Sequence, residues 1–172
     1  TALAAELGCI SADHLVATEP TDLDAMARAG TVAVILPGTT LGLGSHRFAN
    51  ARAMVARGVP VALGSDHNPG TCPSENLPLM MALATRYCGL QPAEAVVAAT
   101  RNAAHAVGAG GVAGRLAVGR PADLVVMDTA DYRDLTYRFG GNPAWAVLVA
   151  GCRVVPEGGA RAPTASERRS SR

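Results

Sequence analysis

The feature that most constrains the fold is an uninterrupted apolar run, Thr31-Val-Ala-Val-Ile-Leu36. A run of this length without alternation is typical of a strand that is buried on both faces, as in parallel sheets. Shorter strands are expected at residues 9–15 and 60–66. Helical patterns lie between the strands, at 21–29 and 50–57. This alternation predicts an α/β fold with a parallel sheet, either doubly wound or closed into a barrel.

In the second half of the sequence, an Ala-rich helical region is followed by a region of turns and short strands. Helices are expected within residues 75–107, with Pro92 in a first turn and Thr100 as an N-cap. A turn-rich stretch follows, and strands are then expected at 122–128, 145–150 and 153–155. We therefore predict three parts, which are an α/β part at 1–109, a small β part at 110–156 and a disordered tail at 157–172.

Composition excludes several classes of function. The net charge is +1 and aromatic residues make up 3% of the chain, so no basic stripe or stacking surface for nucleic acid is expected. No apolar run approaches the roughly 20 residues that cross a bilayer, and no signal peptide is visible, so a cytoplasmic location without membrane contact is expected. The four cysteines have no metal-ligand spacing, which favours reduced thiols.

Three features lie at the carboxyl ends of the predicted parallel strands, where α/β folds place their active sites. They are His14, the Pro37-Gly38 loop, and Asp66 with the residues after it. A carboxylate at such a point can bind a cation or move a proton, but it can also simply cap a loop. A histidine there can polarise a carbonyl, act as an acid or base, bind metal, or be buried for structural reasons.

The turn after Asp66 carries the other candidates. Asn68, Gly70 and Thr71 offer N–H groups and side-chain donors that could face a carboxylate, although Asn-Pro-Gly is also ordinary turn chemistry. His67 is expected to point away from the face that carries Asp66. His46 and His105 are expected to be structural or solvent-facing.

These residues and their neighbours resemble the imidazolonepropionases, a family of the amidohydrolase superfamily. The resemblance covers roughly Leu3 to Val155, and its Asp-x-Asn-Pro-Gly-Thr turn at residues 66–71 is close to diagnostic. The matching segments are Ser11–Leu15, Gly30–Gly38, Gly58–Thr71, Thr100–Ala104 and Gly119–Val126.

The resemblance implies a partial (β/α)8 TIM-type barrel, with strands six to eight in this chain, and the C-terminal strands of a small β-sandwich domain. It implies that Asp66 is a metal ligand and proton shuttle, and that His14 polarises the substrate carbonyl. Asn68, Gly70 and Thr71 match substrate-binding positions. The implied reaction is hydrolytic ring opening of 4-imidazolone-5-propanoate to N-formimino-L-glutamate, with zinc or iron as the cofactor.

The sequence departs from this family because the His-x-His pair, a further histidine ligand and a catalytic glutamate have no counterpart here. Catalytic zinc normally has three protein ligands, and this chain offers Asp66. We expect an incomplete chain, inactive alone, whose possible partners are an N-terminal half and, when complete, a second copy in a homodimer. Two alternatives stay open: a cytosine- or guanine-deaminase-like amidohydrolase, and a non-catalytic fragment that binds a complementary half.

Overall fold

A computed structural model describes residues 1–154, which form two compact units. The first unit comprises Thr1–Arg115 and Asp131–Asn142, and the described part of the second comprises Leu116–Ala130 and Pro143–Val154. The tail predicted to be disordered, 157–172, lies outside the described residues. The domain boundaries expected at residues 109 and 156 stay predictions.

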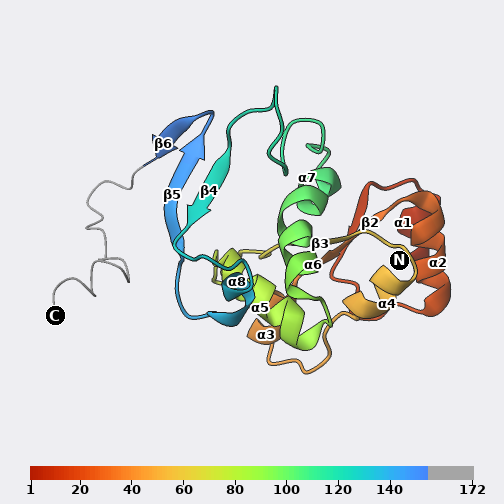
Figure 1. The fold of residues 1–172 in the computed structure, drawn as a ribbon. Coiled ribbons are helices and arrows are strands. Elements are labelled where there is room, and N and C mark those ends of the chain that lie inside the picture. Colours follow the sequence, from red (N-terminus) through yellow and green to blue (C-terminus); the bar gives the residue numbers. More distant parts are fainter. Residues whose placement is uncertain (155–172) are drawn as a thin grey trace. The chain divides into compact units, whose positions relative to one another are not determined.

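A three-stranded parallel sheet is the centre of the first unit (Figure 1). Its strands are β1 (Ser11–Asp13), β2 (Val32–Ile35) and β3 (Val61–Leu63), in the spatial order β1-β2-β3. The register pairs Ala12 with Ala33 and Val34 with Ala62. Since each strand returns through a helical connection, the predicted βαβ units and the parallel sheet are confirmed. The numbering of these strands within a barrel stays a prediction.

The connecting helices follow local signals in the sequence. Helix α2 (Pro20–Ala29) ends at Gly30, which adopts the left-handed conformation with φ 70°. Helix α4 (Ala51–Ala56) begins after Asn50, whose side chain accepts a hydrogen bond from the N–H of Ala53. Helix α1 (Ala2–Glu6) precedes β1. Both helices expected between the strands are therefore present.

Two strand predictions need correction. The strand expected at 9–15 is shorter and only partly buried, because β1 covers Ser11–Asp13 and its last residue is exposed. The strand expected to run to Asp66 ends at Leu63, and Asp66 itself adopts a left-handed φ of 51°, which is not a strand conformation. Asp66 therefore belongs to the loop after the strand.

A further correction concerns the expected Pro37-Gly38 loop, which is the first turn of helix α3 (Pro37–Gly42). Proline is accepted at this position because its missing N–H would have no partner within the helix. Gly38 packs closely here, since a Cβ atom on it would lie 2.7 Å from Cys72 Sγ. A side chain at this position would therefore collide with its neighbours.

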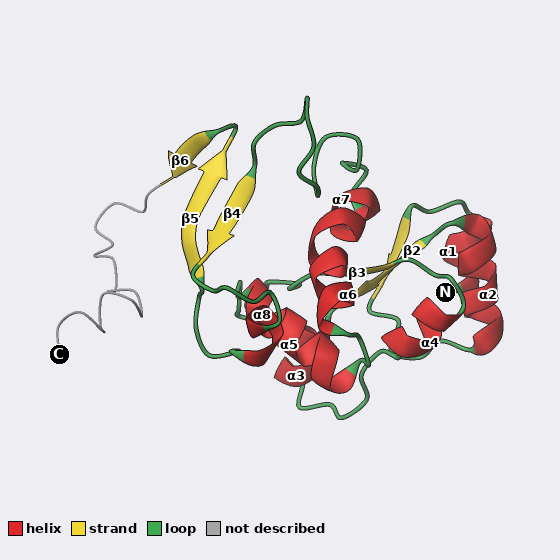
Figure 2. Cartoon of the chain, viewed as in Figure 1, coloured by secondary structure: helices red, strands yellow, loops and turns green. Residues whose placement is uncertain are grey.

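The Ala-rich region is a series of helices beside the sheet (Figure 2). Thr100 was expected to be an N-cap, and that is wrong because the residue lies within a π-helical turn and its hydroxyl donates to Val96 O at 2.7 Å. Arg86 ties this region to the last helix of the unit by donating to Thr136 O at 2.6 Å. The helices of the Ala-rich region are α5 (Leu77–Tyr87), α6 (Pro92–Val97), the π-helical η1 (Ala98–Asn102) and α7 (Ala103–Ala106). The last helix of the unit is α8 (Asp134–Tyr137).

The second unit contains an antiparallel sheet in the order β4-β5-β6. Its strands are β4 (Leu124–Met127), β5 (Ala144–Val149) and β6 (Cys152–Val154), close to the three expected segments. A tight turn at Ala150 and Gly151 joins the last two strands, and both residues have positive φ. Whether this sheet belongs to a sandwich domain stays a prediction.

Two expectations about the chain as a whole can be compared with the described residues. All four cysteines are free thiols, as expected. Among residues 1–154, no helix has the length and apolar character needed to cross a bilayer.

Candidate active site

His14 and Asp66 come together at the carboxyl end of the parallel sheet. His14 follows the last residue of β1 directly, and Asp66 lies in the loop after β3, with β2 between the two strands. The distance from His14 Nε2 to Asp66 Oδ2 is 4.0 Å. Their side chains are 52% and 33% exposed, so both remain open to a ligand. The structure therefore brings together the two side chains that the sequence analysis singled out.

Both residues are held in an uncommon backbone conformation. The φ angles of His14, Leu15 and Asp66 are 67°, 57° and 51°, in the left-handed region that costs an ordinary residue about 1–2 kcal/mol. Leu15, which is buried, donates its N–H to Asp13 O at 2.9 Å and helps to hold the turn. Strained residues of this kind cluster at functional sites, where the surrounding structure fixes them.

Thr39 completes this edge of the sheet and was missed by the sequence analysis. It lies in the first turn of α3, directly after the middle strand, and is only 7% exposed. Its hydroxyl donates to Asp66 Oδ2 at 2.6 Å. A buried hydroxyl at this distance fixes the carboxylate, and within the described residues Oδ1 accepts no hydrogen bond. Thr39 follows the Pro37-Gly38 feature of the sequence analysis by one residue, and the role of that feature in a site stays a prediction.

The turn at Asn68–Thr71 is closed by hydrogen bonds of its own. Asn68 Oδ1 accepts from the N–H groups of Gly70 and Thr71, at 2.9 and 2.8 Å. Asn68 Nδ2 donates to Asp66 O at 2.6 Å and to Thr71 Oγ1 at 3.1 Å. The turn is therefore preorganised beside Asp66, but its predicted substrate-binding donors are engaged with each other. The substrate role of Asn68, Gly70 and Thr71 stays a prediction.

The remaining histidines lie elsewhere. His67 Nε2 lies 3.4 Å from Glu75 Oε1, and among the described residues its side chain forms no hydrogen bond or ion pair with His14 or Asp66. His46 and His105 border two other cavities. The expectation that His67 would not share the site of Asp66 agrees with this geometry.

The donor set fits only part of a metal site. The Asp66 carboxylate and the His14 imidazole are chemically suitable ligands for zinc or iron. Within residues 1–154, however, no group of three His, Cys, Asp or Glu side chains is placed to hold a metal ion. Because catalytic zinc normally takes three protein ligands, these residues do not form such a site on their own.

The model of the amidohydrolase family matches residues 2–155. The chain belongs to the amidohydrolase family. The imidazolonepropionase of Chloroflexus aggregans is 50% identical over 154 residues, which are 90% of this chain and 36% of that protein. The enzyme of Shouchella clausii is 46% identical over 157 residues, 91% of this chain and 35% of that protein. The resemblance inferred from the motifs is confirmed.

This amidohydrolase chain thus spans about a third of the length of its curated relatives. Among solved structures, an adenosine deaminase from Xanthomonas campestris with bound zinc matches with a TM-score of 0.78 and 24% identity, over 96% of this chain and 42% of that one. An atrazine chlorohydrolase mutant from Arthrobacter aurescens, complexed with zinc and atraton, matches with a TM-score of 0.74 and 23% identity, over 84% and 36%. At these identities the structural matches show the fold alone.

Proposed function

We propose that this chain supplies part of the active site of an imidazolonepropionase-type hydrolase, which opens the ring of 4-imidazolone-5-propanoate to N-formimino-L-glutamate. The observation that carries the proposal is the 4.0 Å approach of His14 to Asp66 at the carboxyl edge of the sheet. The identity to imidazolonepropionases over nine-tenths of the chain supports this substrate class. The isolated chain is expected to be inactive.

The proposed chemistry is hydrolysis of a cyclic amide. Water adds to the carbonyl carbon, the ring C–N bond breaks, and the proton lost by water reaches the leaving nitrogen. Asp66 Oδ1 accepts that proton and returns it, because Oδ2 already binds the Thr39 hydroxyl. His14 Nε2 donates to the carbonyl oxygen as negative charge develops on it. In this scheme Asn68, Gly70 and Thr71 contact the propanoate carboxylate.

Zinc or iron is the proposed cofactor, with Asp66 as the ligand from this chain. The other ligands must come from residues outside those described, because residues 1–154 hold no third ligand near the pair. The partner we propose is an N-terminal half of the same enzyme. The identity of the metal, the cytoplasmic location and the homodimer stay predictions.

The test combines this chain with the portion of the Chloroflexus aggregans imidazolonepropionase that it does not match. We expect the complex to open 4-imidazolone-5-propanoate, and Asp66→Asn to lower turnover by about 100-fold or more. His67→Asn is the matched control, since the side chain of this sequence neighbour is directed to Glu75 and not to the pair, and it should retain turnover. A folded complex that fails to open the ring, or that deaminates guanine or cytosine instead, would refute the proposal.

The role of Thr39 can be tested in the same complex. We propose that Thr39 is a positioning residue, which holds Oδ2 so that Oδ1 faces the substrate. Thr39→Val keeps the shape but removes the hydroxyl, so kcat should fall about 10-fold with KM little changed. Thr39→Ser should restore most of kcat. Equal activity of the two variants would show that the hydroxyl has no part in catalysis.

A further inference from the structure

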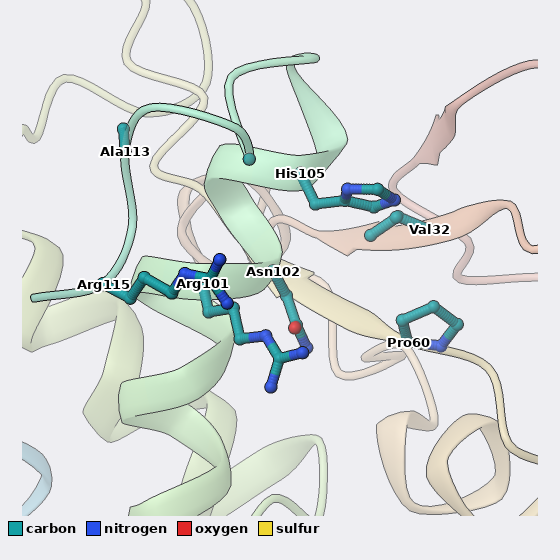
Figure 3. A pocket seen from close by; sticks show the side chains of 8 residues that line it. Val32, Pro60, Arg101, Asn102, His105, Ala113 and Arg115 are labelled. Carbon is teal, nitrogen blue, oxygen red and sulfur yellow. The ribbon is translucent and has the colours of Figure 1, made fainter. Parts of the chain in front are cut away.

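A separate cavity lies at the opposite end of the same strands from His14 and Asp66. Val32, the first residue of β2, and Pro60, just before β3, form one side of it. Arg101, Asn102 and His105 project into it from the helix, and Arg115 borders it from the loop that follows (Figure 3). Its volume is about 290 Å³. Neither the proposed reaction nor the resemblance gives this cavity a role.

The cavity concentrates positive charge without a balancing acid. Two of its lining residues, Arg101 and Arg115, carry guanidinium groups, and none of the lining residues is acidic. Within residues 1–154, neither guanidinium takes part in an ion pair or hydrogen bond, whereas that of Arg52 is paired with Glu94. Two like charges beside one cavity raise its potential, and an anion there would relieve their repulsion.

The helix that carries Arg101 has an uncommon geometry at this point. Arg101 and Asn102 lie in the π-helical turn η1, and such turns are frequent at functional sites. Asn102 Nδ2 donates to Val61 O at 2.8 Å, which anchors the turn on β3. Arg101 is therefore presented from a fixed backbone and not from a fraying helix end.

The loop that carries Arg115 is held against this helix by Gly114. A Cβ atom on Gly114 would lie 2.8 Å from Thr100 O and 3.0 Å from Arg101 Cα, and its φ is +84°. Only glycine permits both the close approach and this backbone conformation. The approach places Arg115 beside the cavity that Arg101 borders, so the two cations are brought together by the fold.

We propose that this cavity binds a doubly charged oxyanion of the phosphate class, either inorganic phosphate or the phosphoryl group of a small metabolite. Two guanidinium charges match a dianion, and the planar fork of each can donate to two phosphate oxygens. His105, from the next turn of the helix, adds a third donor. A cavity of about 290 Å³ holds a phosphoryl group with a small substituent. The proposal does not depend on the hydrolase activity.

The experiment titrates this chain with inorganic phosphate and with methyl phosphate at constant ionic strength, using calorimetry and ³¹P NMR. We expect saturable binding with one site per chain. Arg101→Gln and Arg115→Gln should each weaken it about 10-fold or more, because each removes a charge-assisted contact. Arg28→Gln removes the same charge from the last turn of α2, at a residue that does not line the cavity, and should leave affinity unchanged.

The two ligands distinguish the sources of the anion. If the chain binds both inorganic phosphate and methyl phosphate, the cavity is a site for a phosphorylated metabolite. If it binds inorganic phosphate alone, the cavity is a site for the free ion. Gly114→Ala keeps every charge but moves the loop, so it should also weaken binding. Circular dichroism of each variant checks that it is folded before its affinity is compared. A response that does not saturate, or equal weakening by Arg28→Gln and Arg115→Gln, would overturn the proposal.

Discussion

The two sheets of this chain differ in how well the described residues cover their apolar side chains. In the parallel sheet, Val32 and Ile35 are 0% exposed and Val61 is 3% exposed. In the antiparallel sheet, Val125 is 47% exposed and Trp145 is 43% exposed. Apolar surface left open in this way marks a place for further contacts. Among the described residues, the strands of the parallel sheet are thus buried, whereas apolar side chains of the antiparallel sheet stay about half exposed.

A matched pair of valine truncations gives the largest expected effect. Val32→Ala removes two buried methyl groups next to Ala62 and Ala106 and should lower the free energy of unfolding by about 2–3 kcal/mol. Val125→Ala makes the same chemical change in the antiparallel sheet and should cost less than about 1 kcal/mol. Urea unfolding followed by circular dichroism measures both. Equal losses would contradict the difference in packing between the sheets.

The close packing of the parallel sheet extends to the loops at its carboxyl edge. A Cβ atom on Gly42, at the end of α3, would lie 1.8 Å from the carbonyl oxygen of Thr71. Gly42→Ala must therefore displace the backbone of the Asn68–Thr71 turn, and we expect it to destabilise the chain by about 1–3 kcal/mol. Gly111→Ala, where a Cβ atom meets nothing within 4 Å, is the control and should be nearly neutral. A neutral Gly42→Ala would show that this edge is loosely packed.

The reaction rates of two cysteine thiols, one in each unit, allow the two regions to be compared without a substitution. Burial raises the pKa of Cys88 to about 12, so at pH 8 this residue is both covered and protonated. Cys152, in β6, is exposed. A thiol reagent followed by mass spectrometry should modify Cys152 at least about 10-fold faster than Cys88. In guanidinium chloride the two rates should converge, and a fast reaction of Cys88 in the folded chain would contradict the burial.

Local patterns predicted much of the fold. The apolar run at Val32–Ile35 became a buried strand, and Gly30 ended its helix in the left-handed conformation. Helix α3 was missed because Pro37 and Gly38 normally signal a loop, and the contact of Gly38 with Cys72 is visible only in three dimensions. The N-cap at Thr100 failed for a similar reason, since the helix continues through it as a π turn.

The candidate site was predictable where it depends on topology. Residues that follow parallel strands meet at one edge, so the approach of His14 to Asp66 follows from the strand order. Thr39 has no such signal, because a threonine in a first helical turn is common and its partner lies 27 positions away. Arg101 and Arg115 line the same cavity because the chain approaches the helix closely at Gly114. No pattern in the sequence predicts that approach.

The smallest expected effect concerns Trp145, the single tryptophan, which reports on the antiparallel sheet alone. The Arg153 guanidinium lies 5.2 Å from the centre of its ring, and much of the ring still faces solvent. In the isolated chain we expect red-shifted tryptophan fluorescence that acrylamide quenches readily.

Adding the complementary portion of the Chloroflexus aggregans enzyme should shift the fluorescence of Trp145 by a few nanometres to the blue and reduce quenching, because covering the sheet removes water from the ring. Val125→Ala is the matched control, since it leaves the ring intact. If emission is already blue-shifted and protected in the isolated chain, the antiparallel sheet is covered without a partner, and the contrast between the two sheets disappears.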